Sequence, residues 1–282
     1  MAVFRAWYTF SIMMSTLEAI ILGFVQGLTE FLPVSSTGHL ILVRELFDVT
    51  TEYALAFDAI LHLATAAAVI VYFHKDIWLL LNALLRWMGR LPVNERDLTL
   101  LFAIGMATIP AVLLGLSLES LMGTLFRSPL LVAGVLVVGS FLFMYAEWVY
   151  AKRPPTNEMT LKKGLLIGLF QSLALIPGMS RSGASIAGGM LLGLSREESA
   201  RFAFLIAIPV ILGAGSKKLL ELITLNEPVA WNAVLSGAFV AFFVALFAIQ
   251  FMLSFVRRHS LWPFIWYRLF LAAFVVFVVT FG

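Results

Sequence analysis

The sequence of 282 residues contains no cysteine, and only 12% of its residues are charged. Without cysteine there is no disulfide, no thiolate nucleophile and no cysteine-ligated metal. Soluble domains carry about 25% charged residues, so this composition argues against a water-soluble globular protein. The formal net charge is only +3, which also argues against nucleic-acid binding.

Hydrophobic residues make up 61% of the chain, which is more than a soluble protein of this size could bury. A membrane-spanning helix needs about 20 mostly apolar residues. Six segments fit this description, the fourth of them short: 54–73, 98–117, 129–150, 202–216, 229–255 and 261–281. The segment Met1–Met14 has no clear cleavage site, and we expect it to be retained.

Two further apolar stretches are interrupted by proline, glycine and hydroxyl residues. One runs from Leu17 to Phe47 around Pro33–His39, and the other from Leu165 to Leu194 around Pro177–Gly183. Each half is about 10–14 residues long, too short to cross a bilayer. We therefore predict two re-entrant helix–loop–helix hairpins, each entering and leaving the membrane on one side.

The two hairpins also resemble each other. At an offset of 145 residues, five of sixteen ungapped positions are identical: Gly23 with Gly168, Gln26 with Gln171, Leu28 with Leu173, Ser35 with Ser180, and Gly38 with Gly183. Chance similarity between apolar helices is the alternative. We predict an all-α integral membrane protein, a single domain over 1–282, with six transmembrane helices and two re-entrant hairpins. Its repeats are 16–150 and 161–282.

Basic residues predict the orientation. One face carries twelve of them: Lys75, Arg86, Arg90, Arg96, Lys152, Arg153, Lys162, Lys163, Arg196, Arg201, Arg257 and Arg258. The other face carries five: Arg5, Arg44, Arg127, Lys217 and Lys218. The first face is therefore assigned to the cytoplasm, with both termini outside. Three spans separate the hairpins, so the repeats are inverted and the hairpin tips are expected to meet near the midplane.

The first hairpin tip gathers polar side chains that are costly at membrane depth. Gln26 and Glu30 lie four residues apart and share one helix face. Ser36 is predicted to cap the returning helix, with His39 on its first turn. Ionisable residues within a membrane usually face a cavity and have a function. The alternative is that Glu30 and His39 pair only to hold the hairpin closed.

The second tip places Arg181 among hydroxyl and glycine residues at the start of a helix. A guanidinium binds phosphate oxygens through two hydrogen bonds, and free N–H groups at a helix start also favour anions. Two opposed helix starts plus Arg181 could hold more than one phosphate charge. The alternative is that Arg181 forms a structural salt bridge with Glu30.

Other polar residues give weaker signals. Asp58, His62 and Thr65 share one face of the segment 54–73, where helix packing is favoured over lining a cavity. Arg268, near the start of the last segment, is predicted to snorkel or to form a pair.

The motifs at 26–39 (QGLTEFLPVSSTGH) and 177–185 (PGMSRSGAS) resemble those of the undecaprenyl-diphosphatase family, the bacitracin-resistance proteins. The resemblance covers nearly the whole chain. It implies hydrolysis of undecaprenyl diphosphate to undecaprenyl phosphate and inorganic phosphate in the bacterial inner membrane, with the site open to the outer face. The lipid carrier is thereby recycled for cell-wall synthesis. Implied partners are the polyprenyl diphosphate and membrane lipids but no nucleic acid. Bacitracin would compete for the substrate rather than bind the protein, and a homodimer is left open.

The resemblance also implies functional residues. The catalytic set is Glu30, Ser36, His39 and Arg181. The phosphate ligands are Ser35, Thr37, Gly38, Ser180, Ser182, Gly183 and Ser185. A divalent cation, Mg²⁺ or Ca²⁺, would be held by Glu30 with Gln26 as a neutral ligand, because glutamine cannot supply a second carboxylate. Whether Ser36, His39 or water is the nucleophile stays open, as does the base that would activate Ser36.

Two other classes of protein fit parts of this pattern. Inverted repeats and broken helices are typical of transporters, so a lipid flippase is the main rival. Transport alone, however, does not require a base beside a hydroxyl and an anion-binding arginine. The phosphatidic-acid-phosphatase type is disfavoured, because Ala187 stands where its second histidine would be expected.

Overall fold

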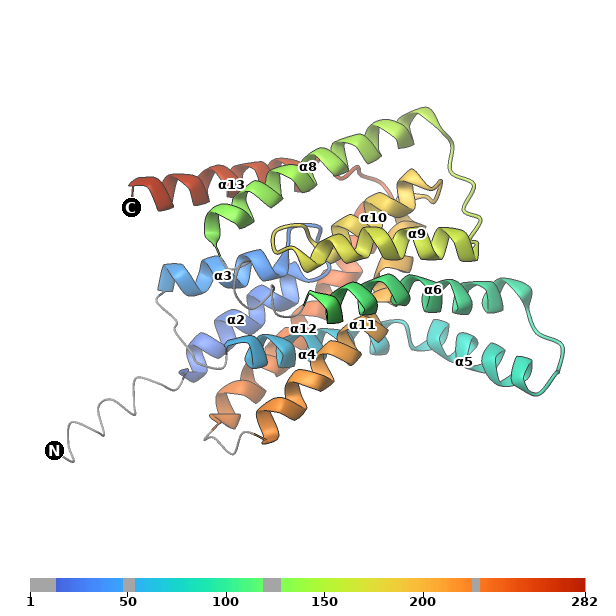
Figure 1. Cartoon of the computed structure of the whole chain (residues 1–282), viewed down its shortest axis with the longest axis horizontal. Helices are drawn as coiled ribbons and strands as arrows, with labels where there is room; N and C mark the ends of the chain where they lie inside the picture. Colours follow the sequence, from blue (N-terminus) through green and yellow to red (C-terminus); the bar gives the residue numbers. More distant parts are fainter. Residues whose placement is uncertain (1–13, 48–53, 119–127, 225–228, 282) are drawn as a thin grey trace.

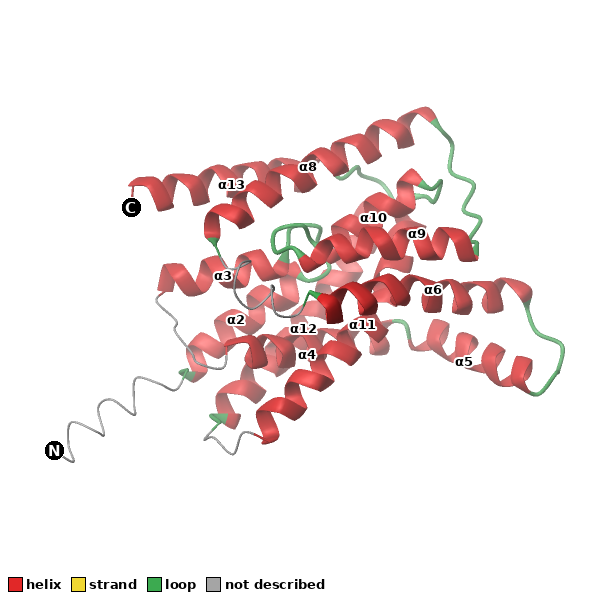
Figure 2. Ribbon diagram, in the orientation of Figure 1, coloured by secondary structure: helices red, strands yellow, loops and turns green. Residues whose placement is uncertain are grey.

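The computed structural model describes residues 14–47, 54–118, 128–224 and 229–281. Its regular structure within these ranges is entirely helical (Figure 2). Five helices are long and apolar enough to cross a membrane: α6 (Glu95–Ser117), α8 (Pro129–Lys152), α11 (Arg196–Thr224), α12 (Trp231–Val256) and α13 (Trp262–Phe281). The predicted multi-span membrane protein is therefore confirmed. Residues 1–13, with Arg5, and also Arg127 lie outside the described ranges.

The remaining predicted span, 54–73, corresponds to a bent pair of helices. α4 (Ala54–Tyr72) is followed by α5 (His74–Met88). The two helices together are long and apolar enough for one span, and they are bent by 79° relative to each other. The prediction for 202–216 was wrong in extent, because α11 has 29 residues and begins at Arg196. Its first turn is polar and carries Glu197 and Glu198, which hid the start of the helix from a search for apolar runs.

Both predicted hairpins are present. The first consists of α2 (Thr16–Thr29) and α3 (Ser36–Phe47), and the second of α9 (Leu161–Ser172), a 3-10 turn at Leu173–Leu175, and α10 (Arg181–Leu191). Their turns lie side by side in the middle of the molecule (Figure 1), where the Gly178 N–H donates to Ser35 Oγ at 3.2 Å. The Ser182 hydroxyl also donates to the Leu32 carbonyl at 3.1 Å. The two tips are thus in direct contact.

The hairpins pack against the spans in a reciprocal way. α2 lies along α12, and α9 lies along α6. Both contacts need glycine: a Cβ at Gly27 would lie 2.6 Å from the Ala241 carbonyl oxygen, and one at Gly164 would lie 2.5 Å from that of Ala103. Small residues let helices approach closely in this way within membranes. α6 and α12 are the corresponding spans of the predicted repeats 16–150 and 161–282. Each hairpin therefore packs against the equivalent span of the other repeat. These boundaries stay a prediction.

Candidate active site

Each hairpin turn ends on a serine with a left-handed backbone. Ser35 has φ 75° and Ser180 has φ 73°. The Ser35 hydroxyl accepts a hydrogen bond from the Gly38 N–H at 3.3 Å, and the Ser180 hydroxyl accepts one from Gly183 at 3.1 Å. Such strained conformations cluster at functional sites. The predicted cap at Ser36 was wrong by one residue, because Ser35 caps α3 and Ser36 is its first helical residue.

A cavity of about 320 Å³ opens between the two tips and the helices α4, α6 and α11. Six of the predicted site residues line it: Glu30, Ser35, Ser36, Thr37, Ser180 and Arg181. The first turns of α3 and α10 both begin at this cavity, and the N–H groups of a first helical turn have no partner within their own helix. The cavity therefore combines a carboxylate, hydroxyls, a guanidinium and two helix N-termini.

The Glu30 carboxylate is at the centre of this arrangement and is only 5% exposed. Arg181 forms a salt bridge and hydrogen bond with its Oε1. Its Oε2 accepts from the Ser36 hydroxyl at 2.6 Å and from the Gln26 amide at 2.9 Å. A buried carboxylate needs such partners, because an unpaired charge at this depth is very costly. The salt bridge to Arg181 considered above does form, but both partners also line the cavity, where a ligand can reach them.

His39 lies behind the first tip. Its Nδ1 is 2.7 Å from the Ser35 carbonyl oxygen, and its Nε2 is 2.7 Å from the Tyr267 hydroxyl. A carbonyl oxygen only accepts, so Nδ1 donates and the neutral ring accepts from Tyr267 at Nε2. The proposed pair between His39 and Glu30 is not formed, and His39 is not among the residues that line the cavity.

The imidazole in the cavity belongs to His62, for which helix packing was favoured; that preference was wrong. Its Nε2 lies 3.6 Å from Glu30 Oε2, while its Nδ1 donates to the Asp58 carbonyl at 2.8 Å. The Asp58 carboxylate is held by Arg44 through bonds of 2.6 and 2.9 Å. Lys218 lines the same cavity and was not anticipated as a site residue. The i, i+4 spacing of Asp58 and His62 was the available signal.

Four predicted phosphate ligands do not line the cavity: Gly38, Ser182, Gly183 and Ser185. Gly183 packs against the ring of Phe143, and the Ser185 hydroxyl is buried with no partner among the described residues. The Ser182 hydroxyl is used in the contact between the tips. The arrangement gives these residues a structural position around the site rather than one within it.

Arg268 forms hydrogen bonds with both hairpin turns. The prediction that it snorkels or pairs was wrong, because the residue is 0% exposed and bonds to main-chain carbonyls. Its Nη1 donates to Met179 at 3.1 Å and Pro33 at 3.4 Å, and its Nη2 donates to Gly178 at 3.0 Å. One guanidinium thus connects the first turn to the second, and it also bonds to the Leu136 carbonyl of α8.

We expect Arg268→Leu to lower the free energy of unfolding by about 3 kcal/mol or more, because several buried carbonyls lose their donor at once. Thermal unfolding of the purified protein in detergent measures this. Tyr267→Phe, which removes a single hydrogen bond next to it, should cost about 1 kcal/mol. A stability equal to that of the parent protein would mean that the carbonyls find other partners.

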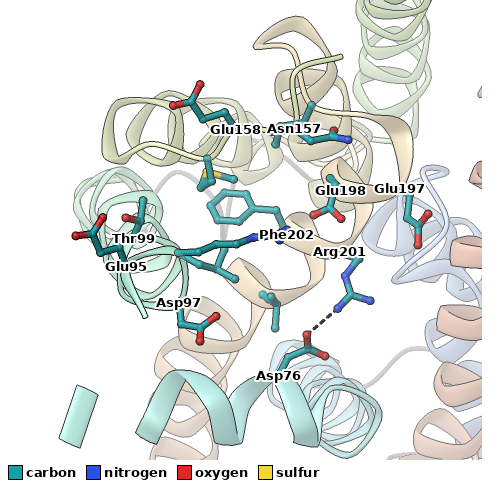
Figure 3. Close-up of a pocket in the computed structure, with 15 residues that line it drawn as sticks. Asp76, Glu95, Asp97, Thr99, Asn157, Glu158, Glu197, Glu198, Arg201 and Phe202 are labelled. Carbon is teal, nitrogen blue, oxygen red and sulfur yellow. Dashed lines mark hydrogen bonds and ion pairs between the residues drawn. The ribbon is translucent and has the colours of Figure 1, made fainter. Parts of the chain in front are cut away.

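A second cavity, of about 610 Å³, lies where α5, α6 and the start of α11 meet (Figure 3). Six carboxylates line it: Asp76, Glu95, Asp97, Glu158, Glu197 and Glu198. Only two guanidiniums oppose them, and that of Arg201 is already bonded to Asp76 at 2.7 Å. The excess negative charge repels phosphates, so this cavity does not suit an anionic substrate.

The described residues offer an incomplete metal site. No group of three histidine, aspartate or glutamate side chains is placed to hold a cation. Gln26, whose amide donates to Glu30, has a buried amide oxygen with no hydrogen-bond partner, but it does not line the cavity. Mg²⁺ or Ca²⁺ takes six or more oxygens, so phosphate and water would have to provide most of the ligands.

Comparison with known proteins shows which family this chain is similar to. The model of the family described as "Bacitracin resistance protein BacA" matches residues 19–274. A protein of Alteromonas mediterranea is 40% identical over 268 residues, which cover 94% of this chain and 99% of the relative. One of Rubrobacter xylanophilus is 41% identical over 266 residues, covering 93% and 98%. Both carry the name undecaprenyl-diphosphatase. The matched region contains both hairpin turns and every cavity residue named above.

Proposed function

Because the chain belongs to the BacA family of bacitracin resistance proteins, we propose that it hydrolyses undecaprenyl diphosphate to undecaprenyl phosphate and inorganic phosphate. The product is the carrier lipid of cell-wall synthesis, and its recycling confers bacitracin resistance. The observation that carries the proposal is the cavity where Glu30, Ser36 and Arg181 meet two helix N-termini. A lipid with a diphosphate headgroup requires a polar site of this kind within a membrane protein.

Phosphate release from undecaprenyl diphosphate by the purified protein tests this function. We expect turnover with the diphosphate and none with undecaprenyl phosphate, because the reaction cleaves the anhydride bond. If reconstituted protein moved the lipid across vesicle membranes without releasing phosphate, the protein would be a flippase instead.

We propose that the diphosphate takes Arg181 away from Glu30. The guanidinium would bind two phosphate oxygens, and the free N–H groups of α3 and α10 would bind others. Glu30 then loses its strongest partner and becomes a better proton acceptor. Its remaining contact with the Ser36 hydroxyl, at 2.6 Å, fits that role.

The same contact favours Ser36 as the nucleophile. Ser36 Oγ would bond to the terminal phosphorus as its proton passes to Glu30, and the bond from that phosphorus to the bridging oxygen would break. The oxygen released by this cleavage takes the proton from Glu30, and undecaprenyl phosphate leaves. Glu30, again a carboxylate, would then accept a proton from the water that attacks the phosphoserine; the bond from phosphorus to Ser36 Oγ breaks, Ser36 regains the proton and inorganic phosphate leaves. His39, bonded to Ser35 and Tyr267, would position the tip rather than transfer the proton.

We propose a divalent cation held by the diphosphate, with Glu30 as the carboxylate ligand from the protein and Gln26 as a neutral one. When bound, the cation neutralises phosphate charge and so lowers the barrier to attack. Gln26 stands close to Glu30, since its amide donates to that carboxylate at 2.9 Å.

Gln26→Glu should therefore make turnover more dependent on the cation. It places two carboxylates side by side, and their repulsion is relieved only by a proton or a cation. We expect the Mg²⁺ concentration for half-maximal rate to fall about tenfold, and the rate without added metal to fall as well. Titration of Mg²⁺ and Ca²⁺ measures both, with Gln26→Met as the control that adds no charge. If the dependence of the rate on metal concentration is unchanged, Gln26 is not a ligand and the substrate holds the cation without it.

We also propose that the protein lies in the bacterial inner membrane with the cavity open to the outer face. The natural absence of cysteine makes this simple to test with single cysteines. In intact cells, a membrane-impermeant maleimide should label Asn232→Cys, at the start of α12, and not Pro154→Cys, between α8 and α9. Both positions are exposed. The reverse labelling would invert the orientation.

A further inference from the structure

An apolar groove of about 510 Å³ runs between α6 and α11. Its lining includes Ile104, Gly105, Ile109, Val112 and Leu113 of α6 and Pro209 of α11. The single hydroxyl in the lining belongs to Thr108, and it already donates to the Ile104 carbonyl at 2.9 Å. The groove therefore suits a hydrocarbon and offers no polar group to a ligand.

The groove adjoins the candidate active site along both helices. On α6, Ala111 lines the active-site cavity and is followed by Val112 and Leu113, which line the groove. On α11, Pro209 lines the groove and is followed by Val210, which lines the cavity. A molecule bound in both spaces would have a polar end in the cavity and an apolar body in the groove.

Gly105 leaves room in the middle of this groove. A Cβ at this position would meet no atom within 4 Å outside its own helix. Gly105 precedes Ala111 by six residues, which is about 9 Å along a helix axis. The groove thus continues well beyond the reach of a diphosphate, to the middle of α6 (Glu95–Ser117).

We propose that this groove holds the isoprenoid chain of the substrate, in the part of the chain next to the diphosphate; this rests on the proposed function. Neighbouring residues of α6 and of α11 line the two spaces, so an occupant of both would join a diphosphate to a hydrocarbon chain, as the substrate does and a bulk lipid does not. The surrounding bilayer is as apolar as the groove. Moving the isoprenoid chain from the bilayer into the groove therefore gains little free energy. The contribution of the groove is to position the diphosphate against Ser36 and Arg181.

Gly105→Phe tests the proposal, because it adds a ring to the groove at a position where a Cβ meets no atom within 4 Å. The purified variant is assayed with undecaprenyl diphosphate and with dimethylallyl diphosphate, whose five-carbon chain is too short to reach Gly105. We expect kcat/KM for the long substrate to fall at least about tenfold, as expected for a steric change in an apolar pocket. For the short substrate it should stay within a factor of two. Gly134→Phe on α8, where a Cβ also meets no atom within 4 Å, should change neither value.

Equal rates with the long substrate for Gly105→Phe and the parent protein would overturn the proposal, and so would an equal loss with both substrates. Photocrosslinking of the parent protein with a diazirine-bearing isoprenoid diphosphate separates this outcome from failure of the proposed function. Labelling of α6 between residues 101 and 113 supports the groove even if no phosphate is released. Labelling confined to α8 would overturn it.

Discussion

Replacement of Arg181 by lysine is expected to reduce kcat/KM at least about 100-fold, and replacement by alanine still further. Arg181 lines the cavity and is bonded to Glu30, so its planar guanidinium is placed to exchange one oxyanion partner for another. Lysine keeps the positive charge but cannot bind two phosphate oxygens in one plane. Steady-state phosphate release, with thermal unfolding of each variant alongside, measures the effect.

The chain offers a matched control for this experiment. Arg196 binds the buried Glu147 with two hydrogen bonds, at 2.5 and 3.0 Å, and neither residue lines the active-site cavity. Arg196→Lys should therefore lower stability while the turnover of the folded protein stays unchanged. Near-normal turnover of Arg181→Lys would mean that Arg181 acts only through its positive charge. Near-normal turnover of Arg181→Ala would mean that Arg181 does not take part in the reaction.

Glu30→Gln is expected to reduce kcat at least about 1,000-fold at every Mg²⁺ concentration. Glutamine preserves the size of the side chain and can still accept a hydrogen bond from Ser36, but it cannot take up the proton. The substitution also leaves Arg181 without its carboxylate, so part of the loss will appear as lower stability. Phosphate release and thermal unfolding, measured over a range of Mg²⁺, separate the two effects.

Glu147→Gln is the counterpart in the second buried pair. It should lose stability to a similar degree, because its carboxylate also accepts from the Leu261 N–H at 2.7 Å, yet it should retain turnover. If Glu30→Gln kept the parental rate and metal response, Glu30 would be neither base nor ligand, and the assignment of the site would be wrong at its centre.

The fold was predictable because its main signals are local. Apolar length predicts the spans, and short apolar halves broken by proline and glycine predict both hairpins. The shared serines at 35 and 180 reflect one local conformation, a left-handed turn that caps a helix. The cap was misplaced by one residue, because adjacent serines are equally good caps in a sequence and only the backbone conformation distinguishes them.

The parts of the site that were missed depend on distant contacts. His39 was expected near Glu30 because the two are close in sequence, but its ring is held by Tyr267, which follows 228 residues later. His62 approaches Glu30 from another helix. A buried arginine without a carboxylate, such as Arg268, is recognisable only when the carbonyls that surround it are known. Chemistry that depends on helix-to-helix placement could not be assigned from motif spacing.

The position of Arg268 also has a consequence for biogenesis. The residue lies in α13, which leaves the ribosome after the other described helices, yet it donates to carbonyls in turns that are made far earlier, at Pro33 and Gly178. Before α13 inserts, these carbonyls lack a donor in a region where water is scarce. Until then the two tips are joined only by their own contacts, at Ser35 with Gly178 and at Leu32 with Ser182. We therefore expect a chain that stops before α13 to carry every cavity residue named here and yet to lack turnover.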